Sequence, residues 1–316
     1  MSLTRARTTK NRTIGIKLEV TDGTYVAPTS AEAAFIVKDP SIKYVKDDKT
    51  FEVVMAQGSA APSRSIPGIR IAEVKLLTPL MNSGVAATPT IVQNMLLCAG
   101  FKGTGTNSKT LLPLTPTDVG QTASAGIWDD GRFKSAAGCS FTWKMTGVMG
   151  KPVMVEFTGR GVGSVAPTDA AMVYGAAPAN LPPILVNASF QIGGTAICVP
   201  GFEIEGGGTV VPRECINETE GVRSFQYIPG VITIKIKPDA LLLADKNWYA
   251  IFRAGTQAAF TVTVGSVTDQ KVVMTAPAIQ LTGDPDTEDD NGLMRDSLEF
   301  QCNASAGDDQ FQILFN

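Results

Sequence analysis

An internal repeat constrains the fold of this chain more than any other feature of its sequence. Five short matches occur in the same order in the two halves of the 316 residues. No single match is informative, but their common order indicates a duplicated domain of roughly 150 residues. The matches pair Pro40–Tyr44 with Pro200–Ile204, Ser65–Ile69 with Tyr227–Val231, Cys98–Gly100 with Arg253–Gly255, Phe141–Thr142 with Phe260–Thr261, and Phe157–Gly159 with Leu281–Gly283.

The repeat predicts a domain layout. We expect an N-terminal arm over residues 1–30, a first domain over 31–175 and a second domain over 176–316. The third and fourth matches are separated by more residues in the first copy than in the second, so the first copy holds additional residues between Gly100 and Phe141. The segment 102–134 is rich in Gly, Thr, Ser and Pro and has no apolar period, which predicts a long loop. Loops of this size are usually functional or disordered; a surface excursion without a role is the alternative.

Composition indicates a globular chain that is made and kept in the cytoplasm. Hydrophobic residues make up 44% of the sequence, and the formal net charge is -3. There is no apolar run of about 18 residues or more and no secretion-signal pattern at the N-terminus, so we expect no membrane association. The cysteines are odd in number and scattered, which favours small buried hydrophobic residues over disulfides or ligands. They are Cys98, Cys139, Cys198, Cys215 and Cys302.

The sequence argues against an enzyme and against a cofactor. It contains no histidine, which removes the commonest general base and the commonest metal ligand. The acidic segment 284–292 does not have the spacing of a calcium loop, so a solvated loop is the better interpretation. The glycine-rich run 100–105 lacks the Lys-Ser or Lys-Thr of a phosphate loop. A pI near 5.2 leaves no basic surface for tight binding of nucleic acid.

Alternating apolar and polar residues predict strands in both halves. The pattern has period two over 139–146, 153–158, 232–237 and 260–264, which is typical of half-buried strands. One helix in each copy follows from its flanking residues: Thr90–Cys98 lies between Pro89 and Gly100, and a second helix begins near Asp245 or Asn247 and ends before Gly255. The prediction is a mainly β chain of two tandem sandwich or open-barrel domains, each with one flanking helix.

The order of these elements resembles the tail tube proteins, also called major tail proteins, of long-tailed, non-contractile bacteriophages. The resemblance covers nearly the whole chain and rests on Gly23–Thr24 with Pro28–Thr29, Ala99–Phe101, Asp130–Gly131 and Asn187–Phe190. In that family, a sandwich domain with a flanking helix forms hexameric rings. Their inner strands join into one β-barrel, and the rings stack into the tube through which the genome passes.

The resemblance also implies how this chain assembles and with what. In members with a duplicated domain a trimer supplies the six positions, and the duplication in this chain fits that variant. The implied partners are further copies of the chain, a tape measure protein inside the tube, terminator and distal tail proteins at its ends, and transiting phage DNA that is not tightly bound. The implied location is the virion tail, assembled in the host cytoplasm.

Two sets of residues are candidates for these contacts. The polar strand faces are the candidate channel wall, with exposure to bulk solvent as the alternative: Glu73, Lys75, Thr142, Lys144, Glu156, Thr233, Lys235, Lys237, Thr261, Thr263 and Gln280. The long loop is the candidate contact between rings, through Lys102, Asn107, Lys109, Trp128 and Lys134. The competing function is a capsid decoration protein or a surface-displayed β-sandwich adhesin.

Overall fold

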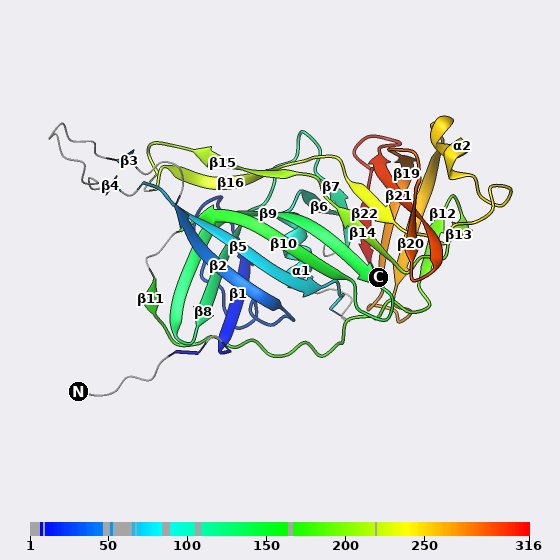
Figure 1. Cartoon of the computed structure of the whole chain (residues 1–316). Helices are drawn as coiled ribbons and strands as arrows, with labels where there is room; N and C mark the ends of the chain where they lie inside the picture. Colours follow the sequence, from blue (N-terminus) through cyan, green and yellow to red (C-terminus); the bar gives the residue numbers. More distant parts are fainter. Residues whose placement is uncertain are drawn as a thin grey trace, which may run out of the picture.

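A long antiparallel band of strands runs across the front of the molecule in a computed structural model (Figure 1). The structure describes residues 7–8, 10–46, 51–52, 65–66, 68–83, 89–104, 109–163, 167–218 and 220–316. In the order of their hydrogen-bonded pairing, the strands of the band are β2 (Lys38–Lys46), β5 (Arg70–Pro79), β10 (Met154–Val162), β9 (Arg132–Val148), β14 (Gly201–Glu205), β17 (Thr233–Ile236), β21 (Leu293–Asn303) and β20 (Asp286–Asp290).

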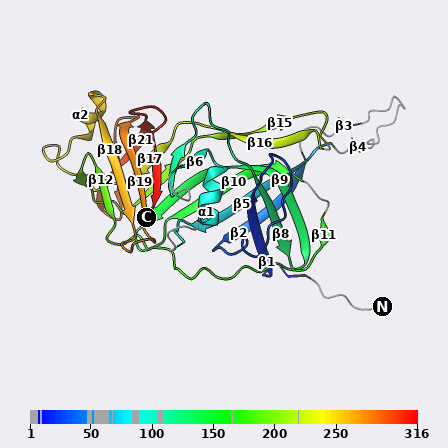
Figure 2. The ribbon, with the colours of Figure 1, turned by 180° about the vertical axis from the view of Figure 1, so that it is seen from behind.

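A second layer lies behind the band (Figure 2). Behind the first half it consists of β1 (Arg12–Leu18), β8 (Ala123–Asp129), the beginning of β9 and β11 (Thr168–Asp169). Behind the second half it consists of β13 (Thr195–Ala196), β12 (Ser189–Ile192), β18 (Gln257–Val264), β19 (Val272–Leu281), β22 (Gln312–Phe315), β7 (Thr110–Pro113) and β6 (Phe101–Thr104). Two hairpins complete the strands: β3 (Phe51–Glu52) with β4 (Ser65–Ile66), and β15 (Thr209–Glu214) with β16 (Val222–Ile228).

Both predicted helices are confirmed, with their predicted ends. Helix α1 (Ile91–Leu97) begins after the N-cap Thr90, which forms a capping box with Gln93. Helix α2 (Trp248–Arg253) begins after Asn247, whose side chain accepts a hydrogen bond from the Ala250 backbone N–H. Most of α1 is buried, whereas only Trp248 of α2 is buried.

The core is continuous across both halves because the band has apolar side chains on its inner face. The predicted alternation of β9 is confirmed: Phe141, Trp143 and Met145 are at most 3% exposed. Trp143 stacks on Phe311, which follows β21, with 5.9 Å between ring centroids. A mainly β fold is therefore what the structure shows, as the sequence predicts.

The same antiparallel pairings recur in the two halves of the chain. In the first half β1 pairs with β8, β8 with β9, β9 with β10, β10 with β5, and β5 with β2. In the second half β12 pairs with β18, β18 with β19, β19 with β21, β21 with β17, and β17 with β14. The division into domains 31–175 and 176–316 stays a prediction.

This pairing order corrects the last two sequence matches. By pairing, β9 corresponds to β19 and β10 to β21, whereas the sequence matches set Phe141 in β9 against β18 and Phe157 in β10 against β19. The local likeness of short apolar strands is not specific, because many strands share the same alternation. Also, β1 falls inside the predicted N-terminal arm and yet pairs along its length with β8.

The predicted long loop over 102–134 is wrong. This segment contains most of β6, then β7 and β8, and the turn into β9. Strand β8 lies between β1 and β9, and its first six residues are buried. Its sequence Ala-Ser-Ala-Gly-Ile-Trp has no polar alternation because both of its faces are covered, so small residues fill the positions that we interpreted as a loop.

Candidate functional site

The outer face of the band is a surface of alternating charges built by cross-strand register. In the first half, Lys43 of β2 lies opposite Glu73 of β5, which lies opposite Arg160 of β10. In the second half, Glu203 of β14 lies opposite Lys235 of β17. Opposite charges on directly facing residues stabilise a sheet modestly, whereas like charges destabilise it. The register therefore gives this face a balanced pattern of charge.

Two ion pairs on the face join directly facing residues. Arg160 and Glu73 approach to 3.7 Å, and Lys235 and Glu299 to 3.8 Å. Because these side chains are a third to a half exposed, each pair contributes on the order of 0 to 1 kcal/mol. Further pairs between residues that do not face one another directly join Lys144 to Glu203, Lys237 to Glu288 and Arg295 to Asp290. The pairs set the local charge more than they stabilise the fold.

Three carboxylates surround Lys144. Its ammonium group donates to the Glu203 carboxylate, and this hydrogen bond raises the pKa of Lys144 above its ordinary value, with further contributions from Glu205 and Glu156. Glu156 lies directly opposite Lys144 on β10 and Glu205 lies directly opposite it on β14. Lys144 thus stays protonated at neutral pH and is neutralised by its neighbours.

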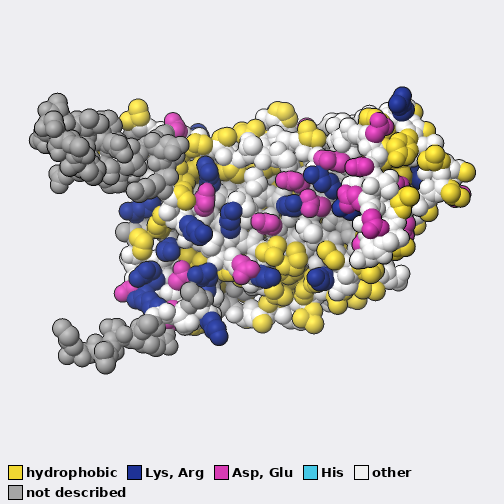
Figure 3. All heavy atoms as spheres, viewed as in Figure 1, with side chains coloured by type: hydrophobic (Ala, Val, Ile, Leu, Met, Phe, Trp, Pro, Cys, Tyr) yellow, Lys and Arg dark blue, Asp and Glu magenta, His cyan; other side chains and the backbone are white. Residues whose placement is uncertain are grey.

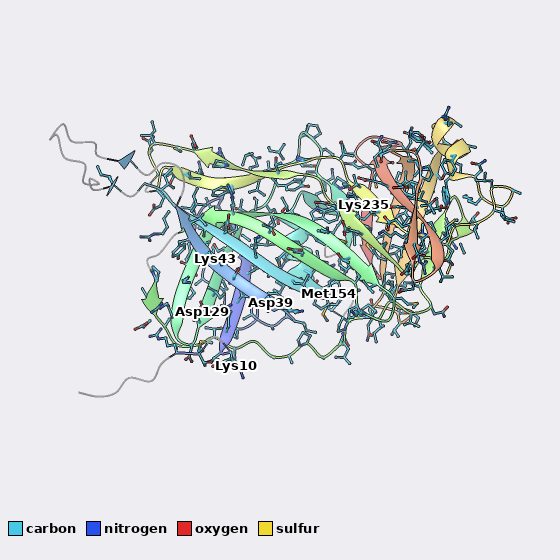
Figure 4. The ribbon with its side chains drawn as sticks, viewed as in Figure 1. Lys10, Asp39, Lys43, Asp129, Met154 and Lys235 are labelled. Atoms are coloured by element: carbon cyan, nitrogen blue, oxygen red, sulfur yellow. The ribbon has the colours of Figure 1, made fainter. Side chains whose placement is uncertain are left out.

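The charged face is hollowed at its second half. A depression of about 750 Å³ is lined by residues of β9, β14, β17, β21 and β20. Its lining combines charged side chains, such as Glu203, Lys235 and Glu288, with apolar ones, such as Phe202 and Leu298. Lys and Arg gather over the first half of the band and Asp and Glu over the second half in the space-filling view (Figure 3). Lys43 and Lys235, from the two halves, lie on the viewed side of the band in Figure 4.

Most of the predicted wall residues come together on this face. Those on β5, β9, β10 and β17 lie there, with Lys237 just after β17. Gln280 joins them through Gln301, its cross-strand neighbour on β21. Thr261 and Thr263 do not: they lie on β18, opposite Thr275 and Val273 of β19, in the second layer. Alternation in the sequence shows which residues of a strand point to the same side. It does not show in which of the two layers the strand lies.

Sequence reasoning missed several charged residues of the face. Glu203 and Glu205 alternate with the buried Phe202 and Ile204 in β14, and this alternation was a usable signal. Arg160 and Glu299 are the outward residues of β10 and β21 in the same way. Lys43 belongs to the first sequence match, but nothing local distinguishes it from an ordinary exposed lysine.

The predicted contact residues of segment 102–134 are mostly tied into the fold. Lys102 binds Asp118 at 2.7 Å, and Lys109 binds Asp269 at 3.2 Å. Trp128 is 5% exposed and packs on Phe133. The remaining two candidates are Lys134, which approaches Asp129 to 3.9 Å, and Asn107, which lies outside the described residues.

Other kinds of site find little support in the described part of the chain. No group of His, Cys, Asp and Glu residues there has the arrangement of a metal site. Cys98, Cys139 and Cys302 are buried as predicted, and burial raises the pKa of each of these thiols, but Cys198 is exposed and Cys215 is half-buried. Neither helix of the described residues is long and apolar enough to cross a membrane.

Comparison with known families decides the class of protein. A family model described as phage tail tube protein matches residues 9–302, nearly the whole chain. This chain belongs to the phage tail tube protein family. A search of curated proteins found no match. Membership makes the chain a structural protein of the virion tail that assembles with itself into a tube, and this family is not a known class of enzyme. The charged band is thus a surface of a tube subunit.

Proposed function

We propose that three copies of this tail tube protein close into a ring, and that stacked rings form the conduit through which phage DNA leaves the capsid. The support is the band, which ends in a different strand on each side, β2 and β20. A contact between two different surfaces generates a ring when its rotation closes. Because the two halves repeat the same pairings, three copies supply six similar positions.

The charged face of the band lines the channel in this proposal. A DNA conduit must not hold phosphates, because each uncompensated Lys or Arg adds a salt-dependent attraction. Four of the cations of this face are paired with acids in the chain itself: Lys144, Arg160, Lys235 and Lys237. The net charge of -3 adds a weak repulsion. The wall is therefore polar and close to neutral.

The proposed partners follow from this position in the virion. A tape measure protein occupies the channel before DNA does, and terminator and distal tail proteins bind the two ends of the tube. Assembly takes place in the host cytoplasm. In this proposal the rings contact one another through exposed connections. One of these is the connection between β7 and β8, where Val119 is 88% exposed. We expect this short connection, and not the whole of 102–134, to meet the next ring.

The mass of the smallest closed assembly tests the proposal. We expect native mass spectrometry of rings released from tubes at low protein concentration to give three times the chain mass of 33.3 kDa. Electron microscopy of the same sample should show a central hole. A smallest closed species of six chains would contradict the trimer, and a monomer that forms no ring or tube under any condition would contradict the function.

A further inference from the structure

The band has two open edges, one at each end. In the described part of the chain β2 pairs only with β5, and β20 only with β21, so each leaves one row of backbone groups without a strand partner. Open edges are templates for pairing with another chain. The two edges differ in charge: β20 reads Asp-Thr-Glu-Asp-Asp, while β2 carries Lys38, Lys43 and Lys46 against one aspartate.

The repeat makes these edges equivalent to strands that already meet inside the chain. The first sequence match sets Lys43 of β2 against Glu203 of β14. From this match, the residue directly opposite on the next strand can be read in each half, one strand after another. This comparison gives four further pairs of equivalent positions in the two halves. These are Glu73 with Lys235, Arg160 with Glu299, Glu156 with Arg295, and Lys144 with Glu288.

All five equivalent positions carry opposite charges in the two halves. The inversion preserves local pairing: the Arg160–Glu73 ion pair of the first half corresponds to the Glu299–Lys235 ion pair of the second, at 3.7 and 3.8 Å. Lys75 and Lys237, two residues further along β5 and β17, are not inverted. The inverted positions include Lys144 and Glu203 at the junction between the halves, and Lys43 and Glu288 on the two edge strands.

The junction inside the chain shows how such edges meet. The end of β9 pairs antiparallel with β14, and Lys144 reaches diagonally to Glu203 at 2.8 Å. The residues equivalent to this pair are Glu288 on β20 and Lys43 on β2, at the two open edges. Within one chain they lie at opposite ends of the band, so they meet only if β20 of one copy pairs with β2 of the next.

We infer that neighbouring copies join by antiparallel pairing of β20 with β2, and that Glu288 of one copy binds Lys43 of the next as a charge-inverted counterpart of Lys144 and Glu203. This inference rests on the proposed ring and names the edges and the contact that close it. The register of the internal junction carries over, so Asp290 of one copy lies opposite Lys43 of the next.

The charge inversion also selects against wrong assemblies. Two β2 edges pairing with one another would bring lysines together, and two β20 edges would bring acids together. Like charges that face one another across an interface disfavour the contact. Only the contact of β20 with β2 is complementary, so the edges exclude a closed two-fold dimer and leave the head-to-tail ring.

Charge reversal at the two residues tests the inference. We expect Lys43→Glu alone and Glu288→Lys alone to raise the critical concentration for assembly at least about tenfold, because each sets like charges together at every junction. Glu288→Lys also removes the ion pair with Lys237 inside the chain, but this pair is exposed and contributes little to folding. The double variant, with both substitutions in one chain, should return to within about threefold of the unchanged protein. Assembly is measured by sedimentation and electron microscopy, and folding of each variant by thermal melting.

The control is Lys75→Glu, an exposed lysine on the same face but on the interior strand β5. It should assemble like the unchanged protein. Single reversals that assemble normally, a double variant that stays as defective as the singles, or an equal defect in the control would each overturn the inference while leaving the ring intact. Failure of the unchanged protein to form rings would instead contradict the proposed function.

Discussion

Lys144 of β9 and Glu203 of β14 form a 2.8 Å ion pair across the junction between the two halves of the chain. The two strands pair edge to edge, so the band continues from one half to the other without a break in hydrogen bonding. The junction makes a continuous wall within one copy. In our account the same kind of junction, with its charges exchanged, continues that wall between copies.

Removing Trp128 should destabilise the fold, because its ring is 5% exposed and lies 4.9 Å from the ring of Phe133. We expect Trp128→Ala to lower the free energy of unfolding by about 3–5 kcal/mol. Urea denaturation of the free subunit measures this. Val119→Ala, at a position that is 88% exposed, is the control and should change little. A small loss of stability in Trp128→Ala would contradict the buried position of β8 and support the interpretation of 102–134 as a surface loop.

A methyl group at Gly100 should be poorly tolerated. Its φ is +89°, and a Cβ atom there would lie 2.1 Å from the Tyr227 ring, whose hydroxyl donates to the Gly206 carbonyl. Gly150 also has positive φ, +78°, but nothing lies within 4 Å of the added atom. We expect Gly150→Ala to cost about 1–2 kcal/mol and Gly100→Ala about 1–3 kcal/mol more. Equal melting temperatures for the two variants would contradict this.

Charge on the wall should control DNA passage more than stability. Glu156 is exposed opposite Lys144, so we expect Glu156→Lys to fold and assemble nearly normally. Tails built from it should eject DNA slowly or incompletely, and rising salt should relieve the defect because phosphate binding is salt-dependent. Asp308→Lys, in the exposed connection after β21, adds the same charge elsewhere. Ejection that is equally fast for both variants would place the band outside the channel.

Glu32 should make stability depend on acid pH. Partial burial raises its pKa, but hydrogen bonds from Thr29 and the ion pair with Lys17 outweigh this and lower the pKa from 4.5 to about 2. A carboxyl whose pKa falls on folding stabilises the protein above its unfolded pKa, and this contribution is lost as pH falls toward the folded pKa. The stability difference between the unchanged protein and Glu32→Gln should therefore shrink between about pH 5 and pH 2. A constant difference would contradict the assignment.

The sequence predicts the elements whose pattern is local. Strands with one buried face, such as the end of β9, alternate with period two, and both helices carry end signals in Thr90 and Asn247. Strand β8 escapes prediction because it is covered on both faces and built from small residues. A deletion of 103–126, harmless to a loop, would remove most of β8 from the sheet.

The candidate site could be predicted only in part. Alternation identifies outward residues such as Lys144 and Glu156, but which layer holds a strand depends on long-range pairing, which separates Thr261 from them. The charge inversion is also hidden from the sequence. A search for repeats finds identical or similar residues, whereas equivalent positions here, such as Lys43 and Glu203, carry opposite charges. Most of these positions are recognised only from the cross-strand register.

Image averaging of rings from the assembled protein tests the central claim most directly. Our account predicts three-fold symmetry, an inner wall with approximate six-fold repetition, and strand β20 of each copy hydrogen-bonded to β2 of the next, with the charged face of the band toward the hole. Rings of six chains, or rings whose charged band faces outward, would contradict it.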